Sequence, residues 1–336
     1  MKKSVKTIAL SLCLLAALLL ATACGGQPAA TAPSVAPNES AAPAESAAPA
    51  AEKVLIGVAQ CHLNTPYRVA LKSEMEATIA AMGLNWEIIL TDGQNNSAKQ
   101  TSDVEDLIQR GVDLIIMAPV QSEPLAPVAK KVMDAGIPLV LVDRTISTDD
   151  YTSFVGGDNW MIGQLAAEYI GEKLGGTGNV VMIQGTLGAS ATNDRYAGFM
   201  ETIAEKYPNL VLLSDLTGDY KRDVGMKVME DVLQANDQID ALYSHSDNMI
   251  LGAMQAIDAA NRNGEMITVS ADGQKEAFDK IIDGQLDGSI LYPTGGQQVV
   301  EIAAKILAGE TVEKINMIPV ILIDNENVED LYDIGF

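Results

Sequence analysis

The chain has 336 residues, of which 48 % are hydrophobic and 4 % aromatic, and it carries a formal net charge of −23 at pH 7. This much apolar material supports a large buried core and excludes a chain that is disordered throughout. The strongly negative charge repels nucleic acid and anionic lipid, so nucleic acid is excluded as a partner.

The first 23 residues have the pattern of a secretion signal. Three lysines precede an apolar run over 8–20, which is shorter than the ~20 residues that a comfortable membrane span needs. Small residues then lead to Cys24, an order that resembles a lipobox, although Ala21 stands where a large aliphatic residue is usual. We therefore expect a cleaved signal peptide, lipidation of Cys24 and an extracytoplasmic protein that acyl chains anchor to the membrane. The alternative is a plain cleaved signal with an incidental cysteine.

The segment 24–52 continues from that cysteine as a linker rich in alanine, proline and serine. Such a composition cannot form a core, and proline favours an extended chain of ~3.1 Å per residue. We expect a tether that holds the folded part several tens of ångströms from the membrane.

The composition of the mature chain limits its chemistry further. Without the signal it has 19 Lys and Arg against 45 Asp and Glu, a formal charge of −26. Besides the lipidation site it keeps a single cysteine, Cys61, so we expect no disulfide framework. With only two histidines in the chain, a zinc site is not expected either.

From Lys53 onward, short apolar runs alternate with amphipathic stretches. The runs occupy 54–59, 86–90, 113–118, 138–142, 152–155, 179–184, 210–213, 239–243, 266–269 and 289–291. Strands this apolar are buried on both faces, which is typical of a parallel sheet covered by helices. Gly111 and Gly136 are placed to end helices before the next strand. The predicted fold class is α/β, with a doubly wound sheet.

The alternation is interrupted after Val142 by a polar loop and starts again after Asp158, so we place a lobe boundary near Gly156 and Gly157. Ligands of open α/β sheets bind beyond the carboxyl ends of the strands. Two such lobes facing each other would form a cleft lined by the residues that follow the strands.

Polar and aromatic side chains follow the strands of both predicted lobes. They lie in the segments 60–68, 143–144, 184–195, 218–220, 244–248 and 271–273. Carboxylates and guanidinium groups make paired hydrogen bonds to neighbouring sugar hydroxyls, and an aromatic ring covers the C–H face of a sugar. Any one Asp could instead cap a helix, and any one Tyr could be core packing. Because every strand end shares this chemistry, the pattern favours a polyol site.

Several motifs identify a family that the chain resembles. They occupy 91–94, 117–120, 137–144, 184–190, 218–220, 247–253 and 271–273. Over Val54 to Phe336 the chain resembles the periplasmic sugar-binding proteins of ABC importers, in the ribose-binding group, and most closely its galactofuranose-binding members. This resemblance implies a type I periplasmic binding protein with two Rossmann-like lobes and a hinge of three crossings, near 156–157, 291–294 and 319–323. The implied lobes are 53–156 plus 294–320 and 157–293 plus 321–336.

The resemblance also implies which residues bind the ligand. Matching positions are Tyr67, Arg68, Asp143, Arg144, Arg195, Tyr220, Ser246, Asp247 and Asp272. Tyr67 and Tyr220 would be the aromatic platforms. Three departures imply a different sugar from that of the relatives: Ser246 replaces a usual Asn, Leu291 replaces a Gln or Glu, and His62 occupies a position that is usually small or polar.

The function implied is capture of a monosaccharide, a furanose or small aldose, by hinge closure, followed by delivery to an ABC permease. We expect a monomer with no enzymatic activity, no cofactor and no metal. One alternative has the same fold presenting a sugar or signal molecule to a chemoreceptor or sensor kinase. A fold-related repressor would need an N-terminal helix-turn-helix, and a hydrolase would need a nucleophile and base that face each other, which neighbours such as Ser244 and His245 rarely do.

Overall fold

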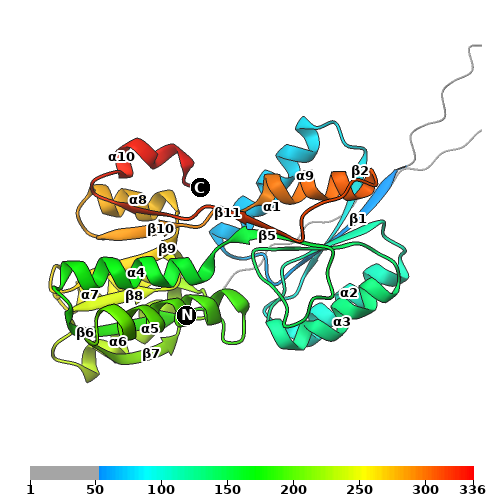
Figure 1. Cartoon of the computed structure of the whole chain (residues 1–336). Coiled ribbons are helices and arrows are strands. Elements are labelled where there is room, and N and C mark those ends of the chain that lie inside the picture. The colour runs from blue at the N-terminus through cyan, green and yellow to red at the C-terminus, as the bar shows by residue number, and fades with distance from the viewer. Residues whose placement is uncertain (1–52) are drawn as a thin grey trace, which may run out of the picture. The chain divides into compact units, whose positions relative to one another are not determined.

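The computed structural model describes residues 53–336, which belong to one compact unit over 51–336 (Figure 1). The predicted signal peptide, Cys24 and the linker over 24–52 lie outside the described residues. Within the described part, no helix is both long and apolar enough to cross a membrane.

The first sheet has six strands, all paired in parallel. In spatial order they are β11 (Ile315–Ile318), β5 (Ser153–Gly157), β4 (Leu139–Val142), β3 (Leu114–Met117), β1 (Val54–Gln60) and β2 (Trp86–Asp92). The central strands are buried on both faces. In β3, for example, Leu114 and Ile116 join one core cluster while Ile115 and Met117 join the cluster on the opposite face.

Helices cover both faces of the first sheet, as the apolar strands require. One face packs against α2 (Ser97–Gln109) and α3 (Ser122–Asp134), through side chains such as Leu107 and Val128. The other face packs against α1 (Pro66–Ala81) and α9 (Gly296–Leu307). Proline at the first turn of α1 suits the start of a helix, because its missing N–H would have no partner there.

The second sheet also has six strands and differs in one pairing. In spatial order they are β12 (Ile321–Asp324), β10 (Gly288–Leu291), β9 (Ile267–Asp272), β8 (Ala241–Ser244), β6 (Thr177–Gln184) and β7 (Asn209–Thr217). Only the pairing of β10 with β12 is antiparallel among these strands.

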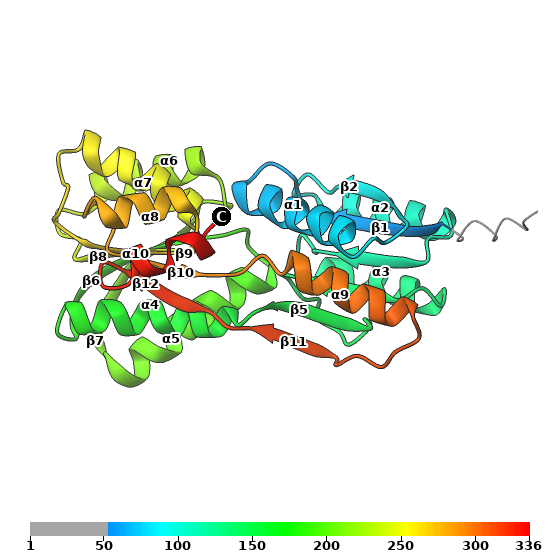
Figure 2. The same ribbon diagram turned by 90° about the horizontal axis from the view of Figure 1, so that it is seen from above.

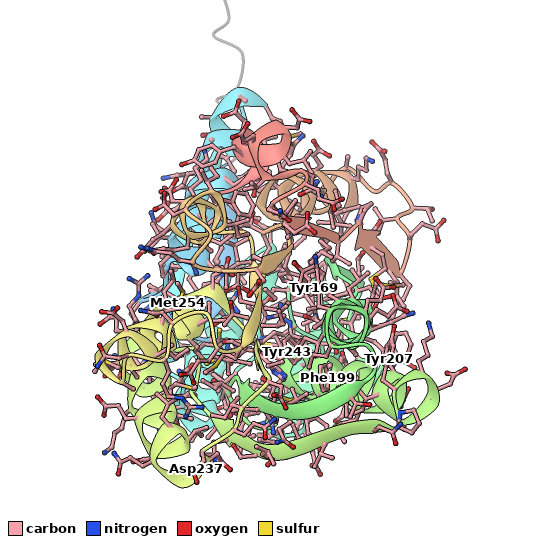
Figure 3. The ribbon with its side chains drawn as sticks, turned by 90° about the vertical axis from the view of Figure 1, so that its left-hand side faces the viewer. Tyr169, Phe199, Tyr207, Asp237, Tyr243 and Met254 are labelled. Atoms are coloured by element: carbon pink, nitrogen blue, oxygen red, sulfur yellow. The ribbon has the colours of Figure 1, made fainter. Side chains whose placement is uncertain are left out.

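Helices cover the second sheet on both faces as well. On one face lie α4 (Asn159–Lys173) and α5 (Ser190–Lys206). There Phe199 of α5 stacks on Tyr243 of β8, with ring centroids 5.0 Å apart (Figure 3). The opposite face packs against α6 (Arg222–Ala235), α7 (Asp247–Ala259), α8 (Lys275–Ile282) and α10 (Val328–Leu331), and the turn Tyr332–Ile334 follows.

The chain passes between the two sheets three times: after β5, after β10, and between β11 and β12 (Figure 2). The first two passages approach closely, since a Cβ atom on Gly157 would lie 2.6 Å from the ring of Tyr292. These sheets confirm the predicted fold class. The strands β11 and β12 were not among the predicted runs, because Pro319 interrupts their apolar segment and proline is uncommon inside a strand.

Candidate functional site

The predicted ligand residues meet in one cavity at the carboxyl ends of the strands. Fourteen residues from both sheets line it: His62, Thr65, Tyr67, Arg68, Asp143, Arg144, Ala191, Arg195, Tyr220, Ser246, Asn248, Asp272, Gln274 and Tyr292. Parallel pairing brings these segments together, because all the carboxyl ends of a parallel sheet lie at one edge. Eight of the nine predicted residues are among them.

On the side of the first sheet, two arginines hold one carboxylate. The Nη2 atom of Arg68 donates a hydrogen bond to Asp143 Oδ2, and Arg144 Nε lies 3.5 Å from the same oxygen. All three side chains are buried. Burial alone raises the pKa of Asp143, but Arg68 and Arg144 outweigh it, so that this pKa lies below its ordinary value. Asp143 is therefore a charged acceptor at neutral pH.

On the side of the second sheet, Arg195 of α5 is the central cation. Its Nε atom donates to Asn159 Oδ1 at 2.9 Å, one Nη atom donates to the carbonyl oxygen of His245, and the same Nη lies 3.6 Å from Asp272 Oδ1. Burial raises the pKa of Asp272 well above its ordinary value, and the attraction of Arg195 offsets only part of this effect. The pKa values of the two carboxyl groups of the cavity are thus shifted in opposite directions.

Three tyrosines supply rings beside these cations. The guanidinium carbon of Arg68 lies 5.3 Å from the centroid of the Tyr67 ring. The same distance is 5.2 Å from Arg144 to Tyr220 and 4.9 Å from Arg195 to Tyr292. The Tyr67 and Tyr292 rings also stack, with centroids 5.7 Å apart. Each guanidinium group therefore lies within the distance of about 6 Å at which a cation and an aromatic ring attract each other.

The backbone is strained where it presents this chemistry. Asp143, Tyr220 and Asp272 have φ angles of 66°, 58° and 136°, which are uncommon for residues other than glycine. Strained residues of this kind cluster at ligand sites, because the surrounding structure has to hold them in place. The unusual backbone conformation of these three residues is therefore typical of a ligand-binding site.

Comparison with known proteins assigns the family. The family model described as "Periplasmic binding protein domain" matches residues 56–311. The ribose import binding protein RbsB of Bacillus subtilis is 34 % identical over 94 % of this chain and 96 % of its own length. The galactofuranose-binding protein YtfQ of Escherichia coli is 33 % identical over 71 % of this chain and 77 % of its own length.

The chain belongs to the periplasmic binding protein domain family. A solved structure, the fructose-binding periplasmic domain of a hybrid two-component system, superimposes with a TM-score of 0.78 at 32 % identity, covering 83 % of this chain and 93 % of that domain. Membership confirms the predicted resemblance and fold. It also confirms the prediction that the protein is not an enzyme, because the relatives are substrate-binding proteins.

One predicted ligand residue of this periplasmic binding protein lies outside the cavity lining. The carboxylate of Asp247 is fully buried and accepts hydrogen bonds from the hydroxyl groups of Ser270 and Ser289 and from the backbone N–H groups of Gly273 and Gln274. It therefore supports the loop that carries Asp272. Ser246 does line the cavity, and its hydroxyl also caps α7 by accepting from Met249 N at 3.2 Å.

Leu291, which replaces a Gln or Glu of the relatives, does not line the cavity, whereas the next residue does. Leu291 packs into the core beside α8, whereas Tyr292 lines the cavity and donates from its hydroxyl to the carbonyl oxygen of Asp143 at 2.8 Å. Successive residues of a strand point to opposite faces, so a shift of one position exchanges core and cavity. Tyr292 directly follows the predicted run 289–291, and an aromatic residue at a strand end was the signal that could have identified it.

The lining residues Thr65, Ala191, Asn248 and Gln274 were not predicted individually, and His62 was noted only as a departure. His62 follows Cys61, a buried free cysteine. Burial raises the pKa of that thiol, but Arg144, Arg68 and His62 together lower it to about 6. Among residues 53–336, no group of three or more Cys, His, Asp or Glu side chains is arranged to hold a metal ion.

Proposed function

We propose that the cavity binds a monosaccharide, a furanose or small aldose. The observation that carries this proposal is the convergence of three arginines, two carboxyl groups and three tyrosine rings from both sheets on a single buried cavity. The ligand residues proposed are Tyr67, Arg68, Asp143, Arg144, Arg195, Tyr220, Ser246 and Asp272. The names of three relatives support a sugar: ribose, galactofuranose and fructose.

The two carboxyl groups suit a ligand whose hydroxyls both donate and accept hydrogen bonds. Charged Asp143 accepts from hydroxyls, and the neighbouring guanidinium groups donate to them. Asp272 keeps its proton to a higher pH than a free aspartate, and in that form it also donates. The tyrosine rings offer apolar faces to the C–H groups of the sugar ring.

Binding requires the two lobes to separate. The cavity has a volume of about 30 Å³. A single water molecule already needs roughly 10–15 Å³, so the cavity has room for only a few water molecules. A monosaccharide is several times larger, so Arg68 and Arg195 have to move with their lobes before it enters. We propose that the lobes, 53–156 plus 294–320 and 157–293 plus 321–336, rotate about the three crossings and close again on the sugar.

In the cell, the proposed role is that of an extracytoplasmic lipoprotein, anchored through Cys24, which delivers its sugar as a monomer to an ABC permease. The names of the ribose import relatives favour import. A second role, presentation of the sugar to a sensor, is favoured by the similarity to a domain of a two-component system. Uptake of labelled sugar by cells with and without the protein distinguishes the two roles.

A thermal-shift screen tests the binding proposal. Protein that begins at Lys53 is refolded to remove copurified ligand and is mixed with aldoses, ketoses, polyols and furanose-rich sugars, and calorimetry follows for each hit. A sugar bound only by the native state raises Tm by mass action. If no sugar raises Tm, the proposed ligand class is wrong.

A further inference from the structure

Two polar atoms beside the cavity have no hydrogen-bond partner: Nδ1 of His62 and Nε2 of Gln274. Both side chains line the cavity, and they are only 4 % and 3 % exposed. Eight buried side-chain atoms in residues 53–336 lack a partner, and these two belong to the cavity lining. Buried polar groups of native proteins are nearly always paired, so each unpaired one calls for a physical explanation.

The two residues approach the cavity from opposite sheets. His62 follows β1 of the first sheet, and Gln274 lies between β9 of the second sheet and α8. A molecule between the lobes can therefore contact both of them at once, and only the closed form provides both contacts together.

The backbone of Gln274 is fixed on both sides. Its N–H donates to Asp247 Oδ2 at 2.7 Å, and its carbonyl oxygen accepts from Ala277 N at 2.9 Å and Phe278 N at 3.1 Å. The point at which the side chain leaves the backbone is therefore fixed at the cavity wall. Its unpaired Nε2 can only donate, so it requires an acceptor oxygen inside the cavity.

His62 is constrained by its burial, since its side chain is only 4 % exposed. A neutral imidazole nitrogen either donates or accepts, depending on which nitrogen carries the proton. A hydroxyl group suits Nδ1 in both cases, because a hydroxyl is itself a donor and an acceptor.

We infer that His62 and Gln274 determine ligand specificity by each taking a hydrogen bond to a sugar oxygen, one from each lobe. This inference rests on the proposed sugar-binding function and deepens it. The ligand is a fully hydroxylated sugar, since an analogue that lacks the facing oxygen leaves a buried polar group unpaired. Sites built to bind a hydroxyl reject analogues without it far more strongly than apolar pockets reject small changes in size.

Calorimetry with the best sugar from the screen, and with its series of single-deoxy analogues, tests this inference on the mature protein. The variants are His62→Leu, His62→Asn and Gln274→Leu. The matched control is Gln297→Leu, because Gln297 is an exposed residue of α9 whose amide bonds to Glu301. The Tm of each unliganded variant reports whether it folds.

We expect each Leu variant to bind about tenfold more weakly or worse, the control to bind normally, and His62→Asn to retain part of the affinity, since its amide keeps a polar atom near the position of Nδ1. One deoxy analogue should bind the unaltered protein much more weakly than the parent sugar, and that difference should disappear in the matching Leu variant. Normal affinity with unchanged discrimination in both Leu variants would overturn the inference. If a Leu variant fails to fold, equal affinity of the unaltered protein for every deoxy analogue would overturn it. Absence of any sugar binding by the unaltered protein would overturn the proposed function and this inference with it.

Discussion

Replacing Gly185 by alanine should impair sugar binding while the protein still folds. A Cβ atom at this position would lie well within 3.0 Å of the Tyr220 ring, closer than real Cβ contacts allow. The ring is the end of a flexible side chain, so it moves away, and the backbone can stay in place. Gly185 itself does not have the positive φ that would forbid alanine.

The magnitude follows from what Tyr220 loses when it moves. Its hydroxyl shares a hydrogen bond of 2.9 Å with Thr192, and its ring lies 5.2 Å from the guanidinium carbon of Arg144. Each contact contributes on the order of 1 kcal/mol. We expect the free energy of unfolding to fall by about 2 kcal/mol, less than the 5–15 kcal/mol typical of a native domain. Sugar affinity should fall at least about tenfold, because the aromatic platform is displaced.

A double-mutant cycle with Tyr220→Ala tests this reasoning. Calorimetry gives the affinity of the unaltered protein, of each single variant and of the double variant, and urea unfolding gives their stabilities. If Gly185→Ala acts through the ring, it should cost nothing further once the ring is gone. An equal loss of affinity on both backgrounds would refute the steric argument.

Three further predictions concern the cavity, the buried carboxylate and the anchor. Arg144→Ala and Asp143→Ala should each abolish sugar binding with an unchanged circular dichroism spectrum, and normal affinity in either would remove it from the site. Burial raises the pKa of Asp247 from 3.8 to about 6, so the native state holds this proton more tightly than the unfolded chain does. Its contribution to the free energy of unfolding should therefore fall by ~3 kcal/mol as pH rises from 3.8 to about 6, and then level off. Urea titrations at several pH values should show this fall in the unaltered protein but not in Asp247→Asn. The same pH dependence in both proteins would contradict the prediction. Cys24→Ala should release the protein from membranes in a fractionation assay, and continued membrane association would exclude the lipid anchor.

Much of the fold could be predicted because its strands are apolar on both faces. Runs such as 113–118 and 138–142 contain too little polar material for a strand that faces water, so the parallel sheet followed from composition. Strands β11 and β12 escaped prediction although their segment is also apolar, because Pro319 interrupts it and proline argues against a strand. They are edge strands, and the apolar residues Ile315 and Met317 are exposed there.

The site was harder to predict, because its details depend on orientation. Asp247 stands in the first turn of α7, where one residue faces the cavity and the next faces the core, and the sequence does not show which. The positive φ angles of Asp143 and Tyr220 are equally invisible in the sequence, since neither residue requires such a conformation. The residue types at the strand ends were nevertheless sufficient to locate the cavity.

The segment from β11 to β12 has a consequence for the order in which the molecule can be made. It adds an edge strand to each sheet, with only Pro319 and Val320 between the two strands. A ribosome releases the chain from its N-terminus, so neither sheet can acquire its last strand until residues near 320 have emerged. Both sheets therefore lack an edge strand until most of the chain has been synthesised.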